Sequence, residues 1–147
     1  MAKKSIPLEV IDLNGNGFHV LVNIMLFKKP FKLVLDTGAS KTAFDKTLLL
    51  ELIHEKELKN SGHLTTGLGT NDMQSFTTEI QDFYIGKFHI PILEVAVLDL
   101  SAINIAYQQL AIAPVLGVLG GDVLVKYQTV INYAECKLTL KRVEQDQ

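Results

Sequence analysis

The amino-acid sequence predicts a mainly β domain with one or two short helices and an extra helical insertion near residues 101–112. Three observations lead to this fold class. Short segments rich in Val, Ile, Leu and Phe, separated by turn residues, fill most of the chain. Helical spacing of apolar residues is confined to two stretches. No linker, low-complexity tract or charge block interrupts the 147 residues, 48% of which are hydrophobic, so we expect one domain over 1–147.

The first quarter of the chain predicts three consecutive strands. The first, "IPLEVIDL" at 6–13, alternates apolar and polar residues and runs into "NGNG" at 14–17, a strong hairpin signal. The second strand, "FHVLVNIMLF", ends at a turn, "KKP", at 28–30. The third is an apolar run that leads directly into Asp36. This segment therefore places a carboxylate at the end of a strand.

The two helical stretches follow the pattern of a capped amphipathic helix. Asp45 is a suitable N-cap for the first, but Leu50 falls off its apolar stripe, which predicts a short helix or one packed on two sides. The stripe consists of Leu48, Leu49, Leu52 and Ile53. Ser101 is a candidate cap for the second helix, and Pro114 lies beyond it as a stop signal.

The rest of the chain again predicts strands. Residues 63–83 suggest a long hairpin with a polar, glycine-flanked tip, and 83–100 suggest two strands that meet at Gly86-Lys87. Residues 115–128 suggest a loop that enters a short helix. The last hairpin, 129–140, turns at Ala134-Glu135.

Composition excludes several classes of function. A net charge of −2 and a single arginine, Arg142, argue against a nucleic-acid partner. Cys136 is the only cysteine, so an intramolecular disulfide is impossible and a thiolate nucleophile or zinc site is not expected. The histidines lack metal-binding spacing, and we expect neither a metal nor another cofactor. They are His19, His54, His63 and His89.

The ends and apolar runs of the sequence bear on location. The start, "MAKKSIPLEVID", contains basic residues but no apolar core of a signal peptide. No apolar run reaches membrane-spanning length, so no membrane partner is expected. The default expectation is a cytoplasmic protein, with loss of a leader as the alternative.

Asp36 and the residues after it suggest acid–base chemistry. An isolated aspartate has a pKa near 4 and is a weak base at neutral pH. Two adjacent carboxylates share one proton, so one acts as an acid and the other as a base on a water molecule. In "DTGAS", Gly38 permits close approach of an N–H to the carboxylate, and the Thr37 hydroxyl can tie the loop to neighbouring main chain.

The segment "LVLDTGASKT" resembles the active-site loop of aspartic proteases, and three further segments occur in the order of that family. "TTGLGTN" at 65–71 resembles the flap over the substrate, and "GVLGGDVL" at 117–124 the apolar segment and short helix beneath the site. "TVINYAECKLTL" at 129–140 is similar to the terminal hairpin. Together they resemble the retropepsin-like, single-lobe branch found in retroviruses and in bacterial aspartyl-protease-like proteins.

The resemblance implies a retropepsin-like acid-protease barrel lobe that hydrolyses peptide bonds in peptide or protein substrates without a cofactor. The chain holds one DTG segment, so the second carboxylate implies a homodimer with Asp36 of each subunit at its axis. The implied catalytic residues are Asp36, Thr37 and Gly38. The implied substrate-binding residues are Ala39, Ser40, Thr66, Gly67, Leu68 and Gly69.

The sequence also departs from the viral pattern. Ser40 and Gly121 stand where retroviral members typically carry an acid and an arginine, and residues 101–114 have no obvious counterpart in them. Asp122 is interpreted as a helix cap or a partner of backbone, and a second catalytic acid is disfavoured, because the residues before it lack the hydroxyl of "DTG". The main alternative is a retropepsin fold used for dimerisation or peptide binding without cleavage. A phosphate loop of the sugar-kinase and actin-like type is disfavoured, because no "GK[ST]" is present and the pattern is mainly β.

Overall fold

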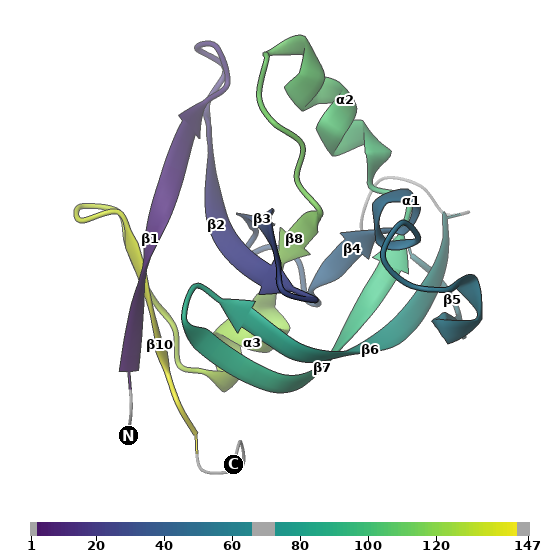
Figure 1. Ribbon diagram of the computed structural model, residues 1–147. Helices are drawn as coiled ribbons and strands as arrows, with labels where there is room; N and C mark the ends of the chain where they lie inside the picture. Colours follow the sequence, from purple (N-terminus) through teal and green to yellow (C-terminus); the bar gives the residue numbers. More distant parts are fainter. Residues whose placement is uncertain (1–2, 66–72, 144–147) are drawn as a thin grey trace.

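The computed structural model describes residues 3–65 and 73–143, with only the backbone described for 61–65, 73 and 74 (Figure 1). The strands are β1 Lys3–Asp12, β2 Phe18–Leu26, β3 Lys29–Leu35, β4 Ala43–Asp45, β5 Lys59–Thr65, β6 Met73–Ile85, β7 Phe88–Leu98, β8 Gly117–Leu119, β9 Val130–Asn132 and β10 Lys137–Lys141. The α-helices are α1 Lys46–Leu49, α2 Ser101–Gln109 and α3 Gly121–Lys126, and a 3₁₀ turn spans Glu55–Glu57. The predicted mainly β fold is confirmed.

Six strands close into a barrel. The neighbours run β6–β7–β4–β8–β3–β2, and a short pairing of β2 with β6 completes the ring. Beyond β2 the sheet continues through β1 and β10 to β9, which lie at one side of the barrel in Figure 1. Most pairs are antiparallel, but β3 runs parallel to β8 and β4 runs parallel to β7. These parallel pairs bring the end of β3 beside the end of β8.

The first two hairpins form as the turn residues predict, with one shift. Asp12 accepts a hydrogen bond from Gly15 N at 2.9 Å within the "NGNG" turn. The next turn lies one residue earlier than expected, because Leu26 pairs with Lys29 and leaves only Phe27 and Lys28 between the strands. Both have positive φ, as the type I′ turn of a two-residue hairpin requires.

β6 and β7 bend together around the barrel. In β6 the buried side chains change from even positions such as Ile80 to odd positions such as Phe83 and Ile85. The change occurs at Asp82, whose φ is +53° and which lies between the pairs Gln81↔Ile92 and Phe83↔Ile90. Both strands thereby keep an apolar face toward the core on either side of the bend.

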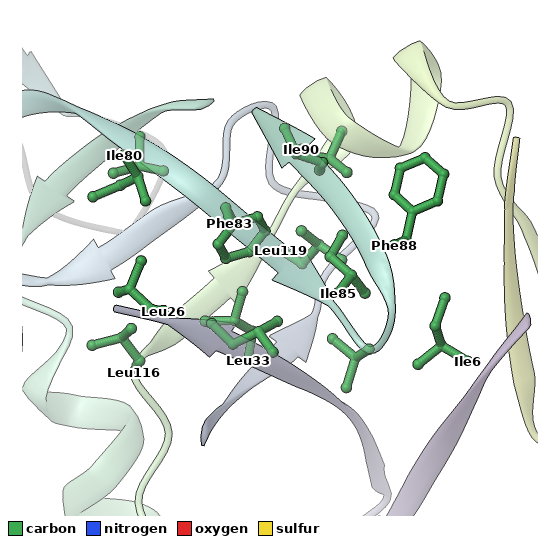
Figure 2. Close-up of a cluster of buried hydrophobic side chains, with 14 of the residues drawn as sticks. Ile6, Leu26, Leu33, Ile80, Phe83, Ile85, Phe88, Ile90, Leu116 and Leu119 are labelled. Carbon is green, nitrogen blue, oxygen red and sulfur yellow. The ribbon is translucent and has the colours of Figure 1, made fainter. Parts of the chain in front are cut away.

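The barrel interior forms the main hydrophobic core. Figure 2 shows side chains from β1, β2, β3, β6, β7 and β8, with Leu116, meeting there. A second, smaller cluster lies under α2 and includes Tyr107, Leu100, Val118 and the half-buried Ala39. The insertion containing α2 is therefore packed onto the part of the barrel that carries the Asp36 loop.

The two cap predictions have different outcomes. Asp45 is the N-cap of α1 and accepts from Leu48 N, and α1 is short, as Leu50 indicated. Ser101 does not cap α2, because it is the first helical residue and the cap position holds Leu100. Asp99 accepts a hydrogen bond from Ser101 N at 2.9 Å instead. No helix in the described part of the chain is long and apolar enough to span a membrane.

Candidate active site

Asp36 lies where the chain leaves β3. Its backbone N–H donates to Leu119 O at 3.0 Å, continuing the parallel pairing of Leu35 with Leu119. Because both strands belong to the closed barrel, this hydrogen bond holds the Asp36 backbone at the rim of a rigid element. The side chain is partly exposed.

The residues after Asp36 turn back around its carboxylate. Gly38 N donates to Asp36 Oδ1 at 3.0 Å, and Ala39 N donates to Asp36 O at 3.2 Å. A Cβ at Gly38 would lie 3.3 Å from the same Oδ1, which is a tight contact. The carboxylate therefore receives an oriented donor on one oxygen, as the sequence predicted for Gly38. The other oxygen accepts no hydrogen bond from a described residue.

A buried network ties this loop to the segment after β8. Asp122 Oδ1 accepts from Thr42 N at 3.0 Å, from Thr42 Oγ1 at 2.8 Å and from Val123 N at 2.8 Å. Thr42 Oγ1 in turn accepts from Gly120 N at 3.0 Å, and Thr42 is fully buried. Four polar groups from the two segments thus form hydrogen bonds with one carboxylate and one hydroxyl. We call this set of hydrogen bonds the Thr42–Asp122 tie.

Close backbone contact reinforces the tie. Gly121 N donates to Ala39 O at 2.7 Å, so the second segment also bonds directly to the Asp36 loop. A Cβ at Gly120 would lie 2.6 Å from the carbonyl carbon of Lys41, and one at Gly117 only 2.0 Å from Ala43 O. These positions exclude any side chain, because the clashing atoms are backbone.

The site therefore consists of a carboxylate at a strand end, an N–H donor within its own loop and a rigid support from β8 and α3. A sequence model of the family described as aspartyl protease matches residues 20–123, which include Asp36, Gly38, Thr42 and Asp122. The chain belongs to the aspartyl protease family. Among curated proteins, none matches its sequence.

Two solved structures of this fold are similar to the chain. One is a retropepsin-like aspartic protease from Rickettsia conorii, with a TM-score of 0.59 and 19% identity, covering 95% of this chain and 94% of that chain. The other is the retroviral protease-like domain of Ddi1 from Leishmania major, with a TM-score of 0.57 and 16% identity, covering 84% of this chain and 88% of that chain. At such low identities the likeness shows the fold, and it confirms the predicted retropepsin-like lobe.

The residues that the aspartyl protease resemblance assigned to the site differ in their surroundings. Thr37 and Ser40 are exposed. The expected tie from the Thr37 hydroxyl to main chain is not found among the described residues, and the buried Thr42 hydroxyl makes that kind of tie instead. The assigned flap residues, Thr66, Gly67, Leu68 and Gly69, lie outside the described residues.

Sequence reasoning missed two features of the site. Thr42, six residues after Asp36, carries no signal that separates it from the other hydroxyls of "TGASKT". Lys41 forms an ion pair with Glu94 on β7, and this contact lowers the pKa of the Glu94 carboxyl. Asp122, by contrast, accepts hydrogen bonds from the backbone N–H groups of Thr42 and Val123, as one of the two interpretations of this residue predicted. It does not cap α3, whose N-cap is Gly120 without a side-chain hydrogen bond.

The position equivalent to Asp36 on the neighbouring strand holds no acid. β8 pairs in parallel with β3, and where β3 continues into Asp36, β8 continues into Gly120. The nearest acid in sequence, Asp122, is occupied by the Thr42–Asp122 tie. No group of three or more His, Cys, Asp or Glu among the residues that the structure describes is placed to hold a metal ion.

Proposed function

We propose that this chain is an aspartic endopeptidase whose active form is a homodimer, with residues 1–147 as the protease domain. Asp36 and Asp36 of the partner subunit would form the catalytic pair. The observation that carries the proposal is the oriented Asp36 carboxylate at the end of β3, in a chain whose sequence holds one DTG segment. A single carboxylate cannot serve as acid and base in the same step, so the chemistry requires a second one.

The proposed reaction uses one protonated and one ionised aspartate. The ionised carboxylate takes a proton from a water molecule, whose oxygen attacks the peptide carbonyl carbon, while the protonated carboxyl donates its proton to the carbonyl oxygen. The resulting diol collapses as the aspartate that took the proton of water gives it to the amine nitrogen, the other aspartate takes a proton from a diol hydroxyl, and the C–N bond breaks. Thr37 and Gly38 shape the loop, and Ala39 and Ser40, with Thr66 to Gly69, would contact an extended peptide.

The first test replaces Asp36 with asparagine. The Asp36→Asn variant keeps the volume of the side chain and an acceptor for Gly38 N, so we expect peptide hydrolysis to vanish while the fold and the dimer persist. Circular dichroism and sizing check the last two. Glu51→Gln is the matched control, because it makes the same carboxylate-to-amide change at an exposed residue remote from the loop in sequence. Full activity in Asp36→Asn would refute the proposal.

Mixing the two proteins tests whether the pair crosses the subunit contact. With random exchange, equal amounts of wild type and Asp36→Asn leave about one quarter of the dimers with both aspartates, so activity should follow the square of the wild-type fraction. A linear dependence would mean that each subunit works alone. A dimer that binds peptide but shows no Asp36-dependent cleavage at any pH would support the non-catalytic alternative instead.

A further inference from the structure

A groove of about 770 Å³ lies at the end of the barrel away from Asp36. It is found beside the short β2–β6 pairing, between the β2–β3 turn and the β6–β7 hairpin. Seven-residue β3 separates Lys28 from Asp36, which places the groove about 25 Å along the strand from the Asp36 loop at roughly 3.3 Å per residue. Its lining residues are Met25, Phe27, Lys28, Gln81, Asp82, Tyr84, Gly86 and Lys87.

The apolar part of the groove presents aromatic surface to solvent. Phe27 is 41% exposed and Tyr84 is 36% exposed. Tyr84 is held in place by stacking on His89, with ring centroids 4.7 Å apart and an interplanar angle of 24°. His89 Nε2 is in turn hydrogen-bonded to Asp82 Oδ1 at 2.8 Å. An exposed ring that is already ordered loses little entropy when a ligand packs against it.

Two lysines beside this surface have no charge partner in the part of the chain that the structure describes. Lys28 comes from one turn and Lys87 from the other, and neither forms an ion pair or hydrogen bond with another described residue. Lys32, Lys41 and Lys137, by contrast, each have a carboxylate partner. The one acid of the groove, Asp82, is engaged by His89. The groove therefore offers two available cations on either side of an apolar surface.

The backbone of the β2–β3 turn is held in an unfavourable conformation. Phe27 has φ +52° and Lys28 has φ +64°, where Asn-Gly would be the favoured pair. This region is unfavourable for a non-glycine residue, because its Cβ approaches the following carbonyl oxygen. Such strain is typical of functional positions, and here it presents the two side chains that give the groove its aromatic and cationic character.

We propose that this groove binds an extended acidic peptide segment, with an aromatic or aliphatic side chain against Phe27 and Tyr84 and flanking carboxylates at Lys28 and Lys87. A free inorganic anion would use the lysines but not the apolar surface. An extended peptide with an apolar side chain between acids uses both. Because the groove lies far from Asp36, its binding would be independent of cleavage.

The test measures fluorescence anisotropy of a labelled peptide with a phenylalanine between pairs of acidic residues, added to the full chain and to its Asp36→Asn variant. We expect saturable binding to both. The comparison peptide replaces the acids by lysines and should bind far more weakly. The readout is binding and not hydrolysis. A lack of peptide binding would therefore not contradict the proposed peptidase activity, and a lack of peptidase activity would not contradict binding at the groove.

Two variants probe the groove itself. Lys28→Glu with Lys87→Glu should weaken binding about tenfold or more, since two exposed ion pairs become repulsive. Phe27→Asn with Lys28→Gly installs the favoured turn, so the thermal midpoint should stay equal or rise while binding is lost. Lys3→Glu with Lys4→Glu is the control, because it changes the net charge equally at exposed positions on β1. Absence of saturation up to about 1 mM peptide, or equal weakening in the control, would overturn the proposal.

Discussion

At the scale of single residues, Thr42 decides how firmly the Asp36 loop is held. Replacing it with valine keeps the shape but removes the hydroxyl, which leaves the buried Gly120 N–H without its acceptor. We expect a loss of about 1–3 kcal/mol in the free energy of unfolding, measured by urea titration. Thr42→Ser restores the hydroxyl and should recover most of it.

The same Thr42 variants test whether the Thr42–Asp122 tie positions Asp36. If the tie orients Asp36, Thr42→Val should lower kcat by roughly tenfold or more with little change in KM, because small displacements of a catalytic group are costly. Thr42→Ser should again rescue. A stability loss without any change in kcat would show that the Thr42–Asp122 tie serves the fold alone.

Residue identity in the sequence predicted the core of the site but not its support. The resemblance of "LVLDTGASKT" to the aspartic protease loop pointed to Asp36 and Gly38, and Gly38 N donates to the Asp36 carboxylate as expected. Thr42 was not predicted, since its role depends on Gly120 and Asp122, which are brought to it only by the parallel pairing of β3 with β8. Asp122 was left with two interpretations for the same reason.

At the scale of elements, the neighbouring glycines at the start of α3 have opposite tolerance for a side chain. Gly120→Ala should destabilise the chain by about 3 kcal/mol or more, because the new Cβ meets the Lys41 backbone at 2.6 Å. Gly121→Ala should be neutral or slightly stabilising, because its Cβ would lie 3.4 Å from Ala39 O and alanine favours the helix. Thermal or urea unfolding of the pair measures the contrast, and equal effects would contradict it.

The packing of α2 through Tyr107 predicts how the stability of the chain depends on pH. Tyr107 lies in the last turn of α2 and is buried, and its hydroxyl is 2.7 Å from His19 Nδ1. Burial raises the pKa of Tyr107 to about 12 from an ordinary value of 10. Above pH 10 the unfolded chain loses this proton first, so the stability contributed by Tyr107 is complete below pH 10 and is lost as pH rises toward 12.

Tyr107→Phe isolates this effect from other titrating groups. At neutral pH the variant should be less stable by about 1 kcal/mol, the usual value of one hydrogen bond. The difference should shrink between pH 10 and 11, because phenylalanine has no proton to lose. Urea unfolding at each pH measures the gap, and a gap that stays constant would mean that Tyr107 does not ionise on unfolding in this range.

Element boundaries were predictable where a local signal sets them. Asp45, the "NGNG" turn and the break at Gly86-Lys87 are local features, and all three appear as expected. Ser101 failed as a cap because the helix begins at Ser101 itself, so Leu100 occupies the cap position. The bend in β6 at Asp82 was not predicted, since it follows from closure of the barrel and no local pattern marks it.

At the scale of the whole molecule, the closed lobe carries Asp36, the carboxylate of the proposed site, and a sheet that ends at β5 and β9. Among the described residues β9 pairs only with β10, and Val130 on it is 59% exposed. Unpaired strand edges of this kind readily pair with another chain. Association that brings two Asp36 carboxylates together would place the proposed function under control of protein concentration.

If the site is complete only in a dimer, specific activity must fall on dilution, because the active fraction is set by mass action. We expect activity per chain to be constant well above the dissociation constant and to decline in proportion to concentration well below it, with a thermal midpoint that rises with concentration. Sedimentation at the assay concentrations measures the dimer fraction directly, and the two curves should coincide. Constant activity where sedimentation finds only monomer would refute the shared pair of aspartates, because one chain would then supply both proton donor and acceptor.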